Sequence, residues 1–323
     1  MNWGIIGLGK ISNKFAEALK LVDDANIYAV ASRNQMKANA FAEKHNAEKA
    51  YNSYGKLFRN DDVEVVYIGT PHVFHAENAI AAMEHGKAVL CEKPIAMNRK
   101  QAQQMFDCAK ANNVFLMEAL WTRFIPSFIK AKELIENGRI GEVKNIVADF
   151  GFRSNHSPES RVFNPKLGGG SILDVGIYPI FLAVTILGKP NAIKAFAKLN
   201  EQQTDNACNI IFDYGDAMAS LTSSLVANQQ VEATIFGTEG SIRLNNRFHE
   251  PTSISIIQQY EEVEKIEFEE DGSGMQYQAI EVQNCIKAGK VQSDLMSWND
   301  SLLLHEVMDS VRREAGVLYE WDS

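Results

Sequence analysis

A glycine-rich hexamer near the start of the chain, Gly7-Leu8-Gly9-Lys10-Ile11-Ser12, has the residue types of a phosphate-binding loop. Gly7 permits a tight turn, and Gly9 lets a pyrophosphate approach the backbone. The following helix then offers free N–H groups and its positive dipole end to the phosphates. Ser12 stands where a third Gly or Ala is usual and is small enough to keep helix and strand close. Such a hexamer alone is often only a turn, but here it joins an expected strand to an expected helix, which favours a cofactor site at Gly7, Gly9, Lys10, Ile11 and Ser12.

The second expected strand ends roughly 20 residues beyond these glycines. In a dinucleotide-binding fold, the residues at this strand end contact the 2′ position of the cofactor's ribose. It reads Ala31-Ser32-Arg33-Asn34, and no carboxylate follows until Glu43. NAD enzymes usually have an acid here, whereas a carboxylate would repel a 2′-phosphate. Ser32 can donate a hydrogen bond to such a phosphate, Arg33 a charge-assisted one, and Lys37 adds a second positive charge one helical turn on. Arg33 and Lys37 are otherwise solvated surface groups. The absence of the acid favours the first interpretation and predicts NADP as the cofactor, with NAD as the alternative.

Polar residues also follow two further expected strands, residues 64–69 and 88–91. The first is followed by Thr70-Pro71-His72 and then His75, and the second by Glu92-Lys93-Pro94. Ligands of open α/β sheets bind outside the carboxyl ends of the strands, so both segments should border the cofactor. We expect His75 to begin the next helix near the nicotinamide ribose. No Cys, His or Asp set at metal-ligand spacing accompanies the histidines, so no metal site is predicted.

A third pattern lies in the second half of the chain, where Gly168-Gly169-Gly170 precedes an apolar helical run with Asp174 and Tyr178. Residues four apart share one helix face, so this carboxylate and this phenol can point into one cleft. The alternative is that Asp174 only pairs within its own domain and that Tyr178 is a core residue with a satisfied hydroxyl.

Together, these motifs resemble the glucose–fructose oxidoreductase / inositol dehydrogenase (Gfo/Idh/MocA) family. The resemblance runs through motifs from residue 3 to about residue 188 and through domain layout over the rest. It implies an N-terminal Rossmann domain and a C-terminal domain with an open sheet that is often used for oligomerisation. It also implies that Lys93 is the catalytic lysine, and that the protein is a homodimer or a higher homo-oligomer.

The chain departs from the family pattern at Tyr178, because the usual Asp-x-x-x-His motif has histidine there. A tyrosine is similar to the dimeric dihydrodiol dehydrogenase branch, which includes xylose-type sugar dehydrogenases. Trp121-Thr122-Arg123-Phe124 resembles that branch as well. The resemblance therefore disfavours an inositol dehydrogenase and implies an NADP-dependent dehydrogenase or reductase for CH–OH or CH–CH donors, acting on a small polyol, sugar or trans-dihydrodiol.

The expected reaction is hydride transfer between a carbinol carbon and the nicotinamide. Tyr178 is the preferred proton donor or acceptor at the substrate oxygen, and Lys93 would stabilise the alkoxide and favour the phenolate. The reverse assignment, with Lys93 as the acid/base, stays open. Asp174 would orient this pair or a substrate hydroxyl. Trp121, Arg123 and Phe152 are expected in the pocket wall, with Trp121 beside the cofactor too, although Phe152 suits a core position equally.

The elements that must position these residues change character along the chain. Expected strands at 3–8, 26–32, 64–69, 88–91 and 114–117 alternate with helical patterns, which predicts a doubly wound parallel sheet. After residue 121, closely spaced strand-like runs predict an open, mostly antiparallel sheet, with helices at 126–137, 171–187, 275–288 and 297–314. We therefore predict an α/β fold with an NADP-binding Rossmann domain at 1–120 and an α+β domain for substrate binding and dimerisation at 121–323. Which domain the last helix packs on is left open.

Composition narrows the class of protein further. The formal net charge of −9 gives no support for nucleic acid or an anionic membrane as a partner. The N-terminus lacks a signal-peptide layout, and we expect no apolar run near the roughly 20 residues that span a bilayer. The cysteines are scattered, which favours reduced thiols in the cytoplasm; they are Cys91, Cys108, Cys208 and Cys285.

Two rival functions remain at this stage. The first is an aldose or inositol-type sugar dehydrogenase, which polar hydroxyl-binding groups around the pocket would favour, whereas an aromatic lining would favour a dihydrodiol. The second is a non-catalytic NADP-binding sensor on the same fold. A sensor needs the glycine loop but not Lys93, Asp174 and Tyr178 together, so their joint presence favours an enzyme.

Overall fold

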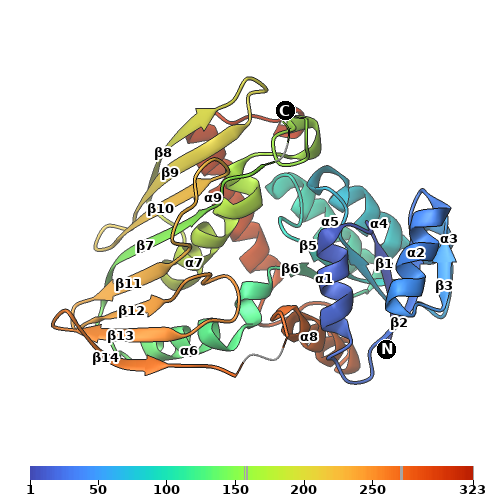
Figure 1. Cartoon of the computed structure of the whole chain (residues 1–323), viewed down its shortest axis with the longest axis horizontal. Helices are drawn as coiled ribbons and strands as arrows, with labels where there is room; N and C mark the ends of the chain where they lie inside the picture. The colour runs from blue at the N-terminus through green and yellow to red at the C-terminus, as the bar shows by residue number, and fades with distance from the viewer. Residues whose placement is uncertain (156, 158, 270–271, 323) are drawn as a thin grey trace. The chain divides into compact units, whose positions relative to one another are not determined.

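The structure, a computed structural model, describes residues 1–155, 157, 159–269 and 272–322 (Figure 1). The chain divides into two compact units, residues 1–121 with 271–302 and residues 122–270 with 303–323. The second unit is therefore not the uninterrupted segment 121–323 that we expected, because α8 (Met275–Lys287) and the start of α9 (Trp298–Glu314) group with the first unit. Trp298 attaches the start of α9 to the first unit. Its ring stacks on Phe106 at 5.5 Å, and its Nε1 donates to the Leu116 carbonyl at 2.9 Å.

The first unit contains a six-stranded sheet in the order β3-β2-β1-β4-β5-β6, in which every pair of neighbours is parallel. This confirms the doubly wound sheet, although the short strand β3 was not predicted. The strands are β1 (Asn2–Ile6), β2 (Asn26–Ala31), β3 (Lys49–Tyr51), β4 (Val65–Ile68), β5 (Ala88–Glu92) and β6 (Leu116–Ala119). The helices between them are α1 (Lys10–Leu19), α2 (Gln35–His45), α3 (Tyr54–Phe58), α4 (His75–Glu84) and α5 (Arg99–Asn112).

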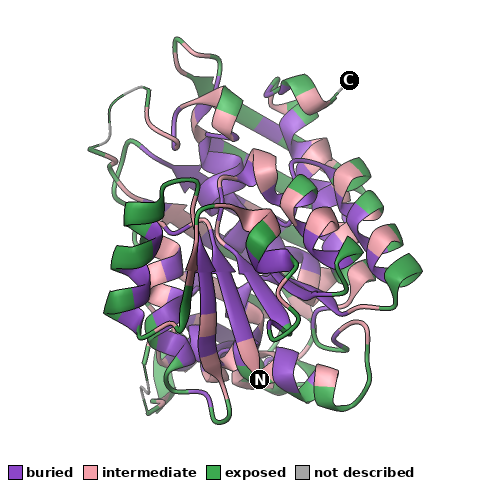
Figure 2. Cartoon of the chain, turned by 90° about the vertical axis from the view of Figure 1, so that its right-hand side faces the viewer, coloured by how far each residue is buried: buried purple, intermediate pink, exposed green. Residues whose placement is uncertain are grey.

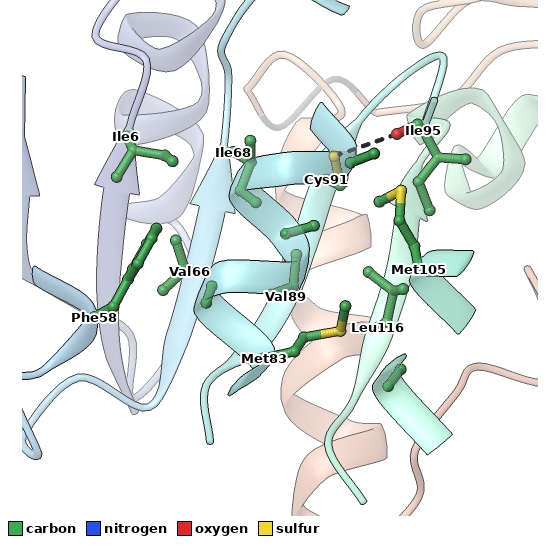
Figure 3. Close-up of a cluster of buried hydrophobic side chains, with 14 of the residues drawn as sticks. Ile6, Phe58, Val66, Ile68, Met83, Val89, Cys91, Ile95, Met105 and Leu116 are labelled. Atoms are coloured by element: carbon green, nitrogen blue, oxygen red, sulfur yellow. Dashed lines mark hydrogen bonds between the residues drawn. The ribbon is translucent and has the colours of Figure 1, made fainter. Parts of the chain in front are cut away.

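The central strands of this sheet consist of continuous apolar runs, and they are buried on both faces, as Figure 2 shows in purple. In Figure 3, Val66, Val89 and Leu116 from three neighbouring strands face Met83 of α4 and Met105 of α5. Burial of each such side chain contributes about 1.5–3 kcal/mol. The apolar core thus fixes the strands whose carboxyl ends carry the polar motifs.

The second unit contains an eight-stranded sheet in the order β14-β13-β12-β11-β7-β10-β9-β8. Within the described part of this sheet, only β7 and β10 pair in parallel, which confirms an open, mostly antiparallel sheet. The strands are β7 (Val143–Gly151), β8 (Ala192–Leu199), β9 (Asp205–Asp213), β10 (Met218–Ser224), β11 (Ala233–Gly237), β12 (Ser241–Leu244), β13 (Ile254–Gln258) and β14 (Glu261–Ile266). The last two, β13 and β14, were not predicted.

Helices α6 (Pro126–Glu136) and α7 (Ile177–Leu187) lie on one face of this sheet, and Phe128 of α6 stacks on Phe181 of α7 at 5.3 Å. The stretch Pro165–Leu187 is long and apolar enough to cross a membrane by length and composition, contrary to our expectation of no such run. However, 78% of its most apolar window is buried inside the structure, as in a core helix of a folded domain.

Candidate active site

The glycine loop of the first unit joins β1 to α1 at the point where the strand order reverses between β1 and β4. Ligands of doubly wound sheets bind at such switch points. Gly7 has φ 74°, and a Cβ there would lie 2.4 Å from Gly69 C and Thr70 N. Only glycine therefore fits where the loop after β1 meets the loop after β4. Ser12 is buried and donates to the Gly7 carbonyl at 2.8 Å, which holds the helix against this turn.

Gly9 is a glycine for a different reason. A Cβ there would meet only the Gly7 carbonyl oxygen, at 3.7 Å, so neighbouring atoms do not exclude a side chain. Helix α1 also starts without a side-chain cap from the described residues, whereas Asn34 caps α2 and Asn98 caps α5. The space at Gly9 and these uncapped N–H groups fit the pyrophosphate of a dinucleotide. Lys10 is exposed and Ile11 half-buried at the same helix start.

The residues at the end of β2 lie at the edge of the sheet that the glycine loop occupies. Ser32 accepts a hydrogen bond from the Asn34 N–H at 3.2 Å, while Arg33 and Lys37 are exposed. Burial raises the pKa of Tyr54, and the charge of Arg33 and a hydrogen bond with the Gly7 backbone oppose that rise. Tyr54 thus lies close to both Arg33 and the glycine loop. This edge holds the cationic and hydroxyl groups that suit a 2′-phosphate.

His75 joins the two loops that carry the remaining motifs of the first unit. Its ring is fully buried, with Nδ1 2.8 Å from the Pro94 carbonyl oxygen and Nε2 2.8 Å from the Thr70 carbonyl oxygen. Both partners are acceptors and a neutral imidazole donates only once, so both bonds form fully only with the doubly protonated ring. Its neighbour His72 is also buried, with its ring edge-on at 5.7 Å. The contact with the ribose that we expected for His75 stays a prediction.

Glu92 holds the backbone from which Lys93 projects. Burial raises the pKa of this carboxyl group. It accepts hydrogen bonds from the Tyr67 hydroxyl at 2.6 Å and from the Lys93 N–H at 3.2 Å. The Lys93–Pro94 peptide bond is cis, and Lys93 itself is half-buried. The cofactor-binding role expected for Glu92 stays a prediction; its hydrogen bonds hold the turn after β5 in place.

Trp121 is buried at the end of the first unit and lies under a cation. The Lys14 ammonium lies 4.4 Å from the centre of the Trp121 ring, within cation–π distance. Lys14 was not predicted, although it lies one turn beyond Lys10 on α1, and that spacing was the available signal. Arg123, expected in the pocket wall, lies in the second unit with its guanidinium 6.0 Å from the Phe128 ring.

In the second unit, Asp174 and Tyr178 lie on two different kinds of helix. Asp174 belongs to a π-helix (Ile172–Gly176), and Tyr178 to α7, which continues it. Both are buried, and Asp174 accepts a hydrogen bond from Arg161 at 3.1 Å. The sequence predicts one regular helix here, and the π-helical segment differs from that prediction. π-turns of this kind occur frequently at functional sites.

Two aromatic rings from remote segments flank Tyr178. Its ring centre lies 5.3 Å from Phe150 of β7 and 5.1 Å from His249, and these two rings are 4.3 Å apart. His249 is buried, and its carbonyl accepts a hydrogen bond from Thr122 at 2.9 Å. Sequence reasoning gave no role to Phe150 or His249, because the cluster forms only when segments far apart in the chain meet. Phe152, two residues beyond Phe150, packs against a small buried apolar cluster consisting of Val162, Phe163, Val175 and Leu225.

Among the described residues, no group of three or more His, Cys, Asp or Glu side chains could hold a metal ion.

Comparison with known proteins places these features in a family. Residues 1–120 match the model of an oxidoreductase family with an NAD-binding Rossmann fold, and residues 128–243 match the Gfo/Idh/MocA C-terminal domain. Trans-1,2-dihydrobenzene-1,2-diol dehydrogenase of Danio rerio is 38% identical over 100% of this chain and 99% of its own length.

Two solved structures have the same fold. A 3-ketoreductase from Actinomadura kijaniata, in complex with NADP and TDP-benzene, is 25% identical with a TM-score of 0.86, over 97% of each chain. A levoglucosan dehydrogenase, in complex with NADH and levoglucosan, is 23% identical with a TM-score of 0.87, over 98% of this chain and 97% of its own. The family resemblance drawn from the motifs is confirmed, and the chain belongs to the Gfo/Idh/MocA family of oxidoreductases.

Proposed function

We propose that this oxidoreductase is an NADP-dependent dehydrogenase whose substrate is a cyclic trans-dihydrodiol. The aromatic surroundings of Tyr178 carry this proposal. Phe150 and His249 place two flat rings within 5.3 Å of the Tyr178 ring centre. Flat aromatic rings suit a planar, unsaturated ring better than the hydroxyl-covered faces of a sugar. The name of the Danio rerio relative agrees with this substrate class.

The roles of the chain's own residues follow from this chemistry. A bound nicotinamide would supply the hydride acceptor for the carbinol carbon, and the substrate hydroxyl would release its proton. Tyr178 is the preferred acceptor of that proton, and Lys93 is the cation that stabilises the developing alkoxide. The reverse assignment differs in one respect, since Lys93 would then take the proton itself. Asp174, which is paired with Arg161, orients the second substrate hydroxyl.

The preference for NADP rests on the end of β2. The exposed cations Arg33 and Lys37 and the hydroxyl of Ser32 replace the carboxylate that NAD enzymes use there. The proposed binding residues also include Trp121, which lies under the Lys14 ammonium. Arg123 and Phe152 are the further proposed residues of the substrate pocket wall.

The same proposal includes a homodimer formed through the outer face of the eight-stranded sheet, in the cytoplasm. The face of this sheet opposite α7 exposes apolar side chains, because β-strand residues alternate between faces. Phe196 is 78% exposed, and four more exposed residues share its face: Val147, Ile211, Met218 and Phe236. A second copy covering this face would remove that surface from water. Sedimentation showing one concentration-independent monomer would contradict the dimer.

The test of the activity is a panel of trans-dihydrodiols and aldoses, with NADP reduction as the signal. We expect turnover of the dihydrodiols and at least tenfold lower kcat/KM for aldoses. Faster turnover of aldoses would instead assign a sugar dehydrogenase. Binding of NADP with no turnover of any substrate would assign a sensor.

A further inference from the structure

A buried carboxylate of the sheet contacts the start of the helical run that carries Asp174 and Tyr178. Asp205, the first residue of β9, has no exposed surface. Its Oδ2 accepts hydrogen bonds from the Ser171 hydroxyl at 2.6 Å and from the Ile172 N–H at 2.7 Å. Ser171 directly precedes the π-helix and Ile172 is its first residue, so the carboxylate caps the helix from outside it.

The neighbourhood of Asp205 is built to admit this carboxylate. A Cβ on Gly170 would lie 2.2 Å from Asp205 Oδ1, so the last glycine of the triple leaves the room that the carboxylate occupies. Ser171 also contacts Ser223 of β10, with 2.8 Å between the hydroxyl oxygens. Asp205, Ser171 and Ser223 thus tie the start of the helix to two strands of the sheet.

A second contact holds the same loop from the C-terminal segment. The Tyr319 hydroxyl donates to the Gly169 carbonyl, and burial with the nearby Asp205 charge raises the pKa of Tyr319, so it remains a donor. Asp322 accepts the Tyr319 N–H at 2.9 Å and two hydrogen bonds from Arg312 of α9. The loop before the helix is therefore fixed on both sides of Gly170.

Stability alone does not account for Asp205. Burial raises its pKa to about 6, despite the hydrogen bonds that oppose the rise. The ionised carboxylate at neutral pH therefore destabilises the fold relative to a neutral side chain of the same shape. The charge does strengthen both hydrogen bonds at the helix start and matches the positive end of the helix dipole.

We propose that Asp205 is a positioning residue, whose buried carboxylate fixes the start of the helix and thereby the placement of Asp174 and Tyr178. This inference rests on the proposed function, because it assigns Asp205 an effect on the step in which Tyr178 takes part. Asp205 acts through the helix and contacts neither substrate nor cofactor.

The test compares Asp205→Asn with Asp213→Asn, an exposed aspartate on the same strand that accepts a hydrogen bond from Gly215. Asp205→Asn should lower kcat about tenfold, the order expected for weakening charge-assisted bonds. The dissociation constant for NADP should stay within about twofold, and the melting temperature should be unchanged or higher. Asp213→Asn should match wild type throughout.

Hydrogen exchange provides a readout independent of activity. The amides of 172–176 should exchange faster in Asp205→Asn than in wild type, and faster still in Asp205→Leu, which leaves Ile172 N–H without its acceptor. If Asp205→Leu does not fold, Ser171→Ala removes one of the two bonds instead.

Unchanged exchange at 172–176, or a loss of kcat, NADP affinity and melting temperature together, would overturn the positioning role. Faster exchange with lower kcat supports it. If exchange rises while Tyr178→Phe remains as active as wild type, the anchor stands and the proposed role of Tyr178 fails.

Discussion

The glycine loop of the first unit and the surroundings of Tyr178 in the second unit are formed by different parts of the chain. Around Gly7 and Gly9, consecutive backbone groups form the loop; neighbouring atoms exclude a side chain at Gly7 but not at Gly9. Around Tyr178, side chains from remote segments do so, namely Phe150 and His249. The first kind of site depends on local conformation, and the second depends on the whole sheet that brings the segments together.

The largest effect is expected where the chemistry itself is removed. Tyr178→Phe should lower kcat by about 10²- to 10⁴-fold, because the proton then has no phenol to accept it. Binding of NADP, measured by fluorescence titration, should be unchanged. Tyr214→Phe is the matched control, since the buried Tyr214 hydroxyl has no hydrogen-bond partner among the described residues. If Tyr178→Phe kept kcat within threefold of wild type, Lys93 would be the proton acceptor.

The two glycines of the loop should respond differently to the same added methyl group. Gly7→Ala forces a side chain to positive φ and into the backbone of Gly69, which should destabilise the fold by roughly 3 kcal/mol or more. Gly9→Ala has room for its Cβ, so unfolding in urea should match wild type while NADP affinity falls at least tenfold. Equal loss of stability in both variants would remove the distinction between the two glycines.

The buried carboxylate of Asp205 should change how the free energy of unfolding depends on pH. The pKa of Asp205 rises from 3.8 to about 6 on folding, so the native state holds this proton more tightly than the unfolded chain. Stability from this group is therefore present at low pH and is lost as pH rises through that window. Between pH 4 and pH 7, wild type should lose roughly 2–3 kcal/mol of unfolding free energy relative to Asp205→Asn. Urea titrations at several pH values measure the difference, and parallel curves would refute it.

The smallest effect is expected at the exposed end of β2. Arg33→Ala should weaken NADPH binding about tenfold and leave NADH binding within about twofold, because only the 2′-phosphate contact is lost. Lys49→Ala is the control, since Lys49 is exposed on the adjacent strand and pairs with Ala29, which precedes the last residue of β2, Ala31, on that strand. Equal weakening of both nucleotides would place Arg33 away from the 2′-phosphate.

These contrasts also explain what could be predicted from the sequence. The parallel sheet and the glycine loop were predicted, because buried strands and turn glycines leave local patterns. The cluster of Phe150 and His249 was missed, and so was Asp205, because nothing within a few residues of each shows what it meets. The π-helix at Ile172–Gly176 was missed because its sequence pattern resembles an α-helix. Edge strand β14 was missed because it is largely exposed and charged.

The most direct test of the proposed substrate class is the ratio of kcat/KM for trans-1,2-dihydrobenzene-1,2-diol to that for D-xylose, in wild type and in Phe150→Leu. If the rings around Tyr178 select a flat diol, wild type should favour the diol at least tenfold, and Phe150→Leu should reduce this preference by about threefold or more, because one aromatic wall is lost. Phe196→Leu, at a ring that is 78% exposed on β8, is the control and should leave the ratio unchanged. A wild type that prefers D-xylose, or a ratio unchanged in Phe150→Leu, would contradict the proposal.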